Sequence, residues 1–513
     1  MDLKLNRETI AVSEKIYDGV QEQSVELDYI LPDYYPDIFK LVKCCVTPMI
    51  VSYSVNGDSV SYELAADIKI LYCSEQSNTM QCISQKMNYS KTVQMGKSCI
   101  KPSVTICPKT DYVNCRVVNQ RRLDMRGAIS VKISITGESS QEVISDIFGM
   151  NVQMKKMPVE YAAKKITASR TVSVSEEVDL NMSKPPVISV IRSSAVLSAT
   201  DKKIISGKLI VKGEAALNVL YTCEGGLETM QFTLPYSQIV DMDGLSEEYQ
   251  CSVRAQTASL DITPTASADG DARKLQCELN ILLECSAVKV VATELVTDVY
   301  STAYKCDFSS SPLKIQQCPT SLNELFQEKT TIENSEGTIE CVYDAWCIAK
   351  NINSRVDPET KSLIISGMIQ YCVMIKSENA MAAMLEKDEA FEHTIQIDEI
   401  SQFSHAEPVV ETVSCSYTLS SSNAVSLKSD IRITGCLYTS SGCEAVTEVG
   451  FDEETKITRD GDYALKLYYG VENEDIWEIA KKYCTSVSAI MEENDLESDR
   501  LTQSGMLLIP IVC

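Results

Sequence analysis

Large apolar and polar residues alternate along several stretches of the chain, and this alternation predicts β-strands. Residues 128–136 (AISVKISIT) and 431–434 (IRIT) have an apolar side chain at every second position, whereas 209–211 (LIV) is a short apolar run. Gly, Asn, Asp and Ser separate such stretches, as expected between strands. Sheets with one apolar face must pack together or close up to bury that face. We therefore expect a mainly β fold, built as sandwiches or barrels.

The strand pattern recurs three times. One stretch ends at Glu75, a second at Glu224 and a third at Glu378, so that successive copies are 149 and 154 residues apart. A second, unrelated marker has spacings of 152 and 150 residues and reads ISDIF from Ile144, VTDVY from Val296 and VTEVG from Val446. Two markers with one period predict three tandem modules of about 150 residues, near the usual size of a domain.

The boundaries between the modules follow from this period. Two polar stretches, 155–169 and 306–320, lie at the expected places, and we interpret them as linkers. The predicted modules span residues 9–165, 166–310 and 311–460.

After residues 458–462 (TRDGD) the period changes from that of a strand to that of a helix. Residues 465–469 (LKLYY) predict a short strand. Asp475, followed by Glu478, is typical of a capped helix start, because a carboxylate accepts hydrogen bonds from the free amides there. Apolar residues then recur at helical spacing, at Ile476, Ile479, Ala480 and Tyr483.

A second helix and a closing strand follow. Ser486 can cap a helix that carries Val487, Ile490 and Met491, and Gly505 precedes the apolar stretch 506–510. The sequence therefore predicts a small α+β domain over residues 464–511, in the order strand, helix, helix, strand (βααβ).

Composition narrows the possible partners. The 513 residues carry a formal net charge of −25, which repels phosphate backbones and anionic lipid surfaces. The N-terminus has no basic segment followed by an apolar one, and no apolar run approaches the roughly 18 residues of a membrane span. We expect a cytoplasmic protein with no nucleic-acid partner and no direct membrane insertion.

The 21 cysteines are an odd number and include no CxxC pair. This usage favours reduced, mostly buried thiols. The alternative is that some of them cross-link once the surrounding compartment loses its reducing power.

Candidate catalytic chemistry is sparse. The two histidines, His393 and His405, are isolated, which makes a zinc site or a histidine-dependent triad improbable. The chain has neither GxxxxGK[ST] nor GxGxxG. Carboxylates cluster near residue 389, but in an acidic protein such a cluster is usually a solvated face. We therefore expect a non-enzymatic binding protein with no cofactor, no metal and no catalytic residues.

The C-terminal domain resembles a LysM domain. The resemblance rests on residues 477–480 (WEIA), 482–483 (KY), 485–487 (TSV), Ile490, Asn494 and 507–510 (LLIP). It implies a module that binds N-acetylglucosamine-containing glycans or, in some proteins, another protein.

In glycan-binding members of that family, the loop before the first helix reads Gly-Asp-Thr, whereas this chain has Asn473, Glu474 and Asp475. A side chain in place of glycine and the added carboxylates favour a protein partner over a sugar. Trp477 is either a packing residue or an interface anchor, and Asn494 is either a helix-ending residue or part of the site. The predicted binding residues are Asn473, Glu474, Asp475, Ile476, Trp477, Asn494 and Leu496.

Residues 31–38 (LPDYYPDI), together with the threefold repeat, resemble the SPOCS domain, a β-rich module of clostridial spore coat proteins. The Pro-Asp-Ile element is reduced to Pro-Pro-Val at residues 185–187 and is missing from the third module. SPOCS repeats followed by one LysM domain resemble the SipL-type family of spore morphogenesis proteins. That resemblance implies a coat scaffold in the mother-cell cytoplasm, at the forespore surface. Its LysM domain would bind the coat-morphogenetic ATPase.

Two alternatives remain open at this point. One is a protein that binds peptidoglycan or N-acetylglucosamine through the LysM domain. The other is an enzyme acting on coat or cortex material, for which the sequence offers no constellation of residues.

Overall fold

The computed structural model describes residues 3–74, 80–98, 100–181, 183–265, 271–316, 319–378, 382–397, 404–457 and 464–511. Within these ranges there are twenty-two β-strands and two short α-helices. The prediction of a mainly β fold is therefore confirmed. Glu75, which marks the first repeat, and residues 458–462 lie outside the described residues.

Residues 4–148 form a six-stranded unit, called unit 1, made of two antiparallel sheets. The sheets have the orders β1–β6–β5 and β2–β3–β4. Their apolar faces pack on each other, and Ile70, Ile83, Ile129 and Ile133 are fully buried between them. The strands are β1 (Lys4–Ile30), β2 (Ile38–Asn56), β3 (Ser59–Ser74), β4 (Met80–Gln94), β5 (Ile100–Asn119) and β6 (Arg122–Phe148).

The same strand order recurs in unit 2. Its sheets are β7–β12–β11 and β8–β9–β10, and their facing residues form a second core. The short apolar run at residues 209–211 lies in β9, where Leu209 and Val211 are fully buried and Ile210 is not. The strands are β7 (Val152–Asp179), β8 (Ser189–Ile205), β9 (Lys208–Cys223), β10 (Gly226–Asp241), β11 (Tyr249–Thr265) and β12 (Lys274–Ser301).

Unit 3 has the sheets β14–β19–β18 and β15–β16–β17 around a third core. The first and last strands, which are continuous in units 1 and 2, are each divided in unit 3. The additional strands β13 and β20 therefore pair with each other in a separate sheet. The strands are β13 (Tyr304–Gln316), β14 (Thr320–Glu333), β15 (Ile339–Asp357), β16 (Ser362–Ser377), β17 (Ala382–Gln396), β18 (His405–Ser421), β19 (Ala424–Tyr438) and β20 (Ser440–Lys456).

The connection between the first and second strands is held in the same way in every unit. Two backbone amides of this connection donate to carbonyls of the turn between the last two strands. The third repeat lacks the Pro-Asp-Ile element in sequence but keeps these bonds, because a backbone amide can donate whatever its side chain. The donors are Leu31 and Ile38 in unit 1, Leu180 and Val187 in unit 2, and Asn334 and Ile339 in unit 3.

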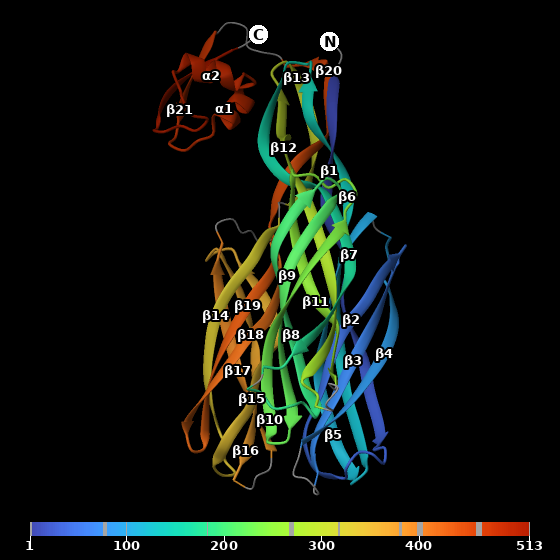
Figure 1. The fold of residues 1–513 in the computed structure, drawn as a ribbon. Coiled ribbons are helices and arrows are strands. Elements are labelled where there is room, and N and C mark those ends of the chain that lie inside the picture. Colours follow the sequence, from blue (N-terminus) through green and yellow to red (C-terminus); the bar gives the residue numbers. More distant parts are fainter. Residues whose placement is uncertain are drawn as a thin grey trace.

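The long first and last strands of each unit extend beyond the sandwiches and form a narrower stalk (Figure 1). Each of its three strand pairs contacts the other two, and all three pairs share two apolar clusters. The repeat markers that begin at Ile144, Val296 and Val446 meet in one of these clusters. The stalk consists of residues 4–15 paired with 136–148, 152–162 paired with 290–301, and 304–316 paired with 440–456.

The two polar stretches that the sequence suggested as linkers are not linkers. The first lies within β7, and the second runs along β13 to the start of β14. The module boundaries expected after residues 165 and 310 therefore fall inside strands, and the chain passes between units at residues 149–151 and 302–303. The stretches are polar because a strand with only one buried face carries polar residues on the other.

Residues 465–510 form the small C-terminal domain, whose elements follow the predicted order. At the start of α1, Asp475 accepts a hydrogen bond from the Trp477 amide at 2.9 Å, and before α2 Ser486 accepts one from Ala489 at 3.2 Å. Both predicted helix caps are confirmed. The elements are β21 (Leu465–Gly470), α1 (Ile476–Tyr483), α2 (Val487–Glu493) and β22 (Gly505–Pro510).

Candidate partner-binding site

The C-terminal domain is attached to the stalk through the first helix, α1. The indole Nε1 of Trp477 donates to Oδ2 of Asp298, on β12, at 2.7 Å. The indole ring packs edge-on against Tyr300, with ring centroids 4.9 Å apart. Trp477 is only 7% exposed. Of the two roles that the sequence left open for this residue, packing is the one supported, and the packing joins two parts of the same chain.

Asp298 and Tyr300 make three further bonds to the domain. Nζ of Lys481 lies 2.7 and 2.8 Å from the two carboxylate oxygens of Asp298. The Tyr300 hydroxyl donates to the carbonyl of Thr485 at 2.7 Å, and burial raises the pKa of this tyrosine. Asp298 thus accepts from both an indole and an ammonium group, which fixes the orientation of α1 on the stalk.

Asp475 links the start of α1 to the same side of the stalk. Its Oδ2 accepts from Nζ of Lys155, on β7, at 2.7 Å. Burial alone would raise the pKa of Asp475, but the hydrogen bonds from Lys155 and from the Trp477 amide lower it. The carboxylate is therefore ionised at neutral pH and serves as both helix cap and ion-pair partner.

The loop before α1 is held by residues of its own domain. Glu474 accepts from the hydroxyl of Tyr468 and from the amide of Val471. Asn473 has a φ of +68°, a conformation that asparagine adopts more readily than most residues. Its amide donates to the carbonyl of Leu501 at 2.8 Å, and Leu501 donates back to Glu474 at 3.0 Å. The loops before α1 and after α2 are thus hydrogen-bonded to each other.

The remaining predicted residues also serve the domain's own fold. The side chain of Asn494 donates to Ile490 at 2.8 Å, where it ends α2, and it exchanges two 2.7 Å bonds with the backbone of Leu508. Ile476 is fully buried, and Leu496 packs against the same core. A role for any of these residues in binding a partner stays a prediction.

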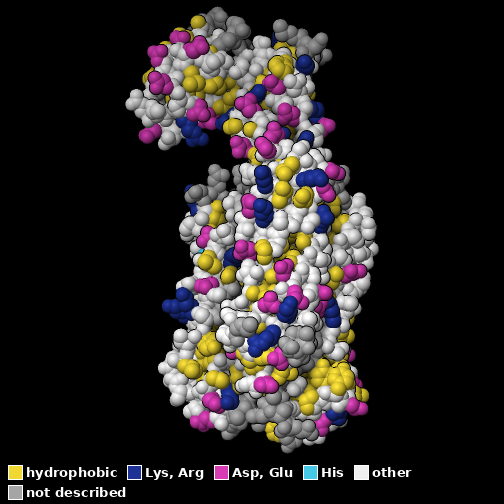
Figure 2. All heavy atoms as spheres, in the orientation of Figure 1, with side chains coloured by type: hydrophobic (Ala, Val, Ile, Leu, Met, Phe, Trp, Pro, Cys, Tyr) yellow, Lys and Arg dark blue, Asp and Glu magenta, His cyan; other side chains and the backbone are white. Residues whose placement is uncertain are grey.

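An exposed apolar surface lies on the sheet of this domain, and the sequence analysis did not identify it. We call it the apolar stripe, and Figure 2 shows apolar side chains on this domain. Leu467 is 67% exposed and Tyr469 is 63% exposed. The alternation in residues 465–469 could have revealed this surface, because one face of the strand packs under the helices and the other face carries Leu465, Leu467 and Tyr469. The stripe consists of Leu465, Leu467, Tyr469, Val471 and Met506.

Unit 2 provides the hydrogen-bonding groups described above, and Phe308 of unit 3 also meets the C-terminal domain, with its ring centroid 5.3 Å from Nζ of Lys481. Asp298 and Tyr300 belong to the VTDVY marker. At the same places unit 1 has Asp146 followed by Phe148, which lacks a hydroxyl, and unit 3 ends its marker with Gly450, which lacks a ring. Neither of the other two markers therefore repeats the combination of Asp298 and Tyr300.

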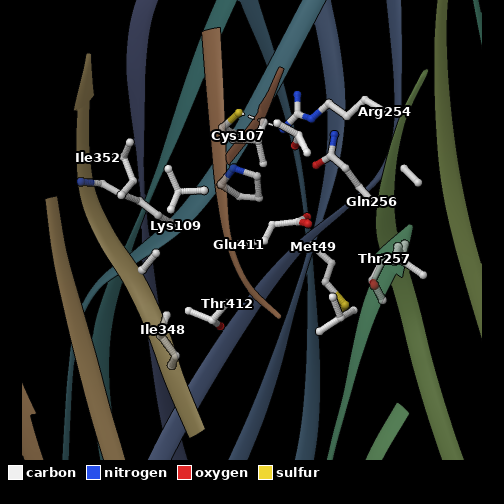
Figure 3. Close-up of a pocket in the computed structure, with 18 of the residues that line it drawn as sticks. Met49, Cys107, Lys109, Arg254, Gln256, Thr257, Ile348, Ile352, Glu411 and Thr412 are labelled. Atoms are coloured by element: carbon white, nitrogen blue, oxygen red, sulfur yellow. Dashed lines mark hydrogen bonds between the residues drawn. The ribbon is translucent and has the colours of Figure 1, made fainter. Parts of the chain in front are cut away.

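We call the part of the molecule formed by the three sandwiches the body. A central cavity of about 2570 Å³ lies in it, where the three units meet. Figure 3 shows side chains from all three units around it, among them Met49, Arg254 and Glu411. Leu71, Ile191 and Trp346, one from each unit, line it and belong to one apolar cluster.

Polar contacts between units line this cavity. Arg192 of unit 2 bonds Asp344 of unit 3 at 3.0 Å. Arg254 of unit 2 donates to Cys107 of unit 1 at 3.1 Å, as the dashed line in Figure 3 marks. Burial raises the pKa of Asp344 despite its arginine partner. These contacts tie the units together around the cavity.

The two histidines stack on aromatic rings. The ring centroids of His405 and Tyr438 are 4.9 Å apart, and those of His393 and Phe326 are 4.5 Å apart. The described residues contain no group of three or more His, Cys, Asp or Glu side chains that could hold a metal ion. No described helix is long and apolar enough to cross a membrane.

The fold is that of a mainly β protein in which one six-stranded pattern occurs three times. The model of one protein family, described as "SipL, SPOCS domain", matches residues 186–265, which comprise β8 to β11. This match supports a SPOCS-domain, sporulation-related protein. The searches of curated proteins and of solved structures found no match to the chain.

Proposed function

We propose that this protein is a non-enzymatic scaffold of the spore coat, acting in the mother-cell cytoplasm at the forespore surface. In this proposal all three units are SPOCS modules and residues 464–511 are a LysM-type domain. The partner is the coat-morphogenetic ATPase of the forespore surface. The match of the SPOCS family model to unit 2 supports a role in sporulation. The recurrence of the same strand order in units 1 and 3 supports the proposal that they too are SPOCS modules.

The observation that carries the proposal is the apolar stripe. Isolated exposed apolar residues are common on protein surfaces, but contiguous apolar patches mark interaction sites. Tyr469 and Met506 are directly opposed on neighbouring strands, so the stripe crosses both strands of the sheet. Because α1 is already occupied by the stalk, the stripe is the apolar surface that the domain has left for a partner.

A glycan is the weaker candidate for the occupant. The loops before α1 and after α2, which border the sugar groove in LysM domains, are joined here by the backbone bonds between Asn473, Glu474 and Leu501. Those backbone groups are therefore already satisfied, and two carboxylates stand in the loop. The stripe itself lies on the sheet and, apart from the hydroxyl of Tyr469, offers apolar side chains rather than the polar groups that orient a sugar.

The test is the binding of the purified full-length chain to the purified ATPase, immobilised on a sensor surface. We expect Leu467→Asp and Tyr469→Asp each to weaken binding by tenfold or more, because a carboxylate must be desolvated in an apolar contact. Tyr112→Asp is the matched control, since Tyr112 is 58% exposed on the body and far from the C-terminal domain in the sequence.

Insoluble chitin and peptidoglycan are tested in parallel with the same proteins. Binding to the ATPase that all three variants retain would refute the role of the stripe. Retention of the chain on chitin, abolished by changes in the loop before α1, would instead favour the glycan function.

A further inference from the structure

The two edges of the C-terminal sheet differ in how their backbone groups are bonded. The amide of Ile511 donates to the carbonyl of Ala464, which fixes the hydrogen-bonding phase of the antiparallel pair β21–β22. Bonded and non-bonded pairs alternate along such a ladder, so every second residue turns its backbone N–H and C=O groups outward. These residues are Leu465, Leu467 and Tyr469 on β21 and Met506, Leu508 and Pro510 on β22.

Side chains of the same domain close the β22 edge. The side chain of Asn494 donates to the carbonyl of Leu508 and accepts from its amide, both at 2.7 Å. The hydroxyl of Thr485 donates to the carbonyl of Pro510 at 2.6 Å, and proline has no amide hydrogen to leave unpaired. A further strand could bond to β22 at these positions only by breaking those bonds.

The β21 edge is open. Within the described residues, the backbone groups of Leu465, Leu467 and Tyr469 have no hydrogen-bonding partner, and we call these backbone groups the free edge. The free edge ends before Val471, whose amide donates to the carboxylate of Glu474 and whose carbonyl accepts from the Glu474 amide. In Figure 1, β21 lies on the side of the domain away from the stalk. A strand with unpaired backbone groups is a template for another extended segment.

The free edge and the apolar stripe share three residues. The side chains of Leu465, Leu467 and Tyr469 are 43, 67 and 63% exposed. A strand added beside β21 would place every second side chain next to them, on the same face of the sheet. One extended segment with apolar residues at alternate positions would therefore bond to the free edge and cover the stripe at the same time.

Charge indicates which extended segment fits. Residues 464–511 contain four Lys and Arg against nine Asp and Glu, which gives this domain a net charge of −5. If the free edges of two copies paired, two domains of the same charge would meet and repel each other. A segment that carries Lys or Arg between its apolar positions is attracted instead.

We propose that the free edge takes up an extended segment of the partner as a third strand of this sheet. The segment is basic, has apolar residues at alternate positions and has no proline where it bonds to β21. This inference rests on the proposed function for the identity of the partner, the ATPase, and adds how that partner is bound.

The first test compares Leu467→Pro with Leu467→Ala in the full-length chain, on the immobilised ATPase. Both changes remove the leucine side chain, but only proline also removes the amide hydrogen. Because this amide points away from β22, proline leaves the bonds between β21 and β22 in place. We expect Leu467→Pro to bind at least tenfold more weakly than Leu467→Ala. Equal binding by the two variants would overturn the proposal.

Deuterium exchange of the unchanged chain, with and without the ATPase, tests the same bonds even if the proline variant unfolds. We expect the amides of Leu465, Leu467 and Tyr469 to exchange at least tenfold more slowly in the complex. Those of Lys466 and Tyr468 face β22 and should change less. Unchanged exchange at the three outward amides would overturn the proposal.

The failure of this proposal can be distinguished from that of the proposed function. Binding that Leu467→Asp and Tyr469→Asp both retain would refute the proposed function. Binding lost in those variants but equal in Leu467→Pro and Leu467→Ala would keep the stripe as the site and refute only the added strand. Association of the chain with itself, lost in Leu467→Pro, would assign the free edge to a second copy and also overturn the proposal.

Discussion

The two sides of the C-terminal domain use different chemistry. The side that meets the stalk buries Trp477 and pairs charged groups across the contact, Lys481 with Asp298 and Lys155 with Asp475. The side formed by β21 and β22 exposes Leu467 and Tyr469, which the described structure leaves without a covering element. A permanent contact within one chain can pair its polar groups as the chain folds, whereas a surface for a separate partner must also be stable in water before that partner binds. We therefore interpret the Trp477 side as the attachment of the domain and the β21–β22 side as its candidate binding surface.

Of the changes that test this comparison, Trp477→Ala should destabilise the C-terminal domain most. Removing a buried tryptophan costs about 3–5 kcal/mol, because the packing against Tyr300 is lost and a cavity remains. We expect the C-terminal domain to unfold at a lower urea concentration than the body, as a separate transition followed by circular dichroism. Tyr469→Ala, which changes an exposed aromatic residue of the same domain, is the control. Equal destabilisation by both changes would contradict the assignment of the two sides.

Asp298→Asn should have the next largest effect. The amide keeps the shape of the side chain but loses the charge that attracts Lys481, which costs about 2 kcal/mol of the docking free energy. The domain itself should stay folded, and the amides of α1 should exchange faster with deuterium. Asp146→Asn, the matching change in unit 1, should leave exchange in α1 as it is. Unchanged exchange in the Asp298 variant would remove Asp298 from the docking contact.

Acid should weaken the docking through Asp475. Its pKa in the folded protein lies below the ordinary 3.8. The unfolded chain therefore takes up the proton first, so the stabilisation is complete above pH 3.8 and is lost as the pH falls through the folded-state value. Deuterium exchange at the start of α1 should rise in that range and less so in Asp475→Asn, which lacks the titrating group. An identical pH dependence in both proteins would assign the effect to other carboxylates.

The smallest effect on stability should come from the apolar stripe. Leu467→Ser and Tyr469→Ser should change the free energy of unfolding by no more than about 0.5 kcal/mol, because both side chains are already in water. Urea denaturation measures this directly. A loss of more than about 1 kcal/mol from either change would mean that the stripe is covered by another part of the chain.

Local order was predictable from the sequence because it depends on near neighbours. The caps at Asp475 and Ser486 and the alternation in residues 128–136 all appear where the sequence pattern placed them. Each depends on a hydrogen bond or a face shared within a few residues. The threefold period was equally visible, because one strand order is written three times.

The long strands through residues 155–169 and 306–320 could not be recognised in the same way. A strand with one exposed face and a polar linker have similar compositions. What separates them is the pairing partner, which lies more than a hundred residues away, as Lys155 with Asp298 in the β7–β12 ladder. The apolar stripe was missed for a related reason, since alternation shows two faces but not which of them is covered.

The sequence by itself determined the strand-rich repeats, the order of elements in the C-terminal domain and the caps of its helices. Only the tertiary structure decided that the units close around a cavity and that Trp477 meets Asp298 and Tyr300. The contacts of Trp477 join residues 179 and 177 positions apart. Their geometry depends on how whole sheets pack, and local patterns of polarity carry no information about that.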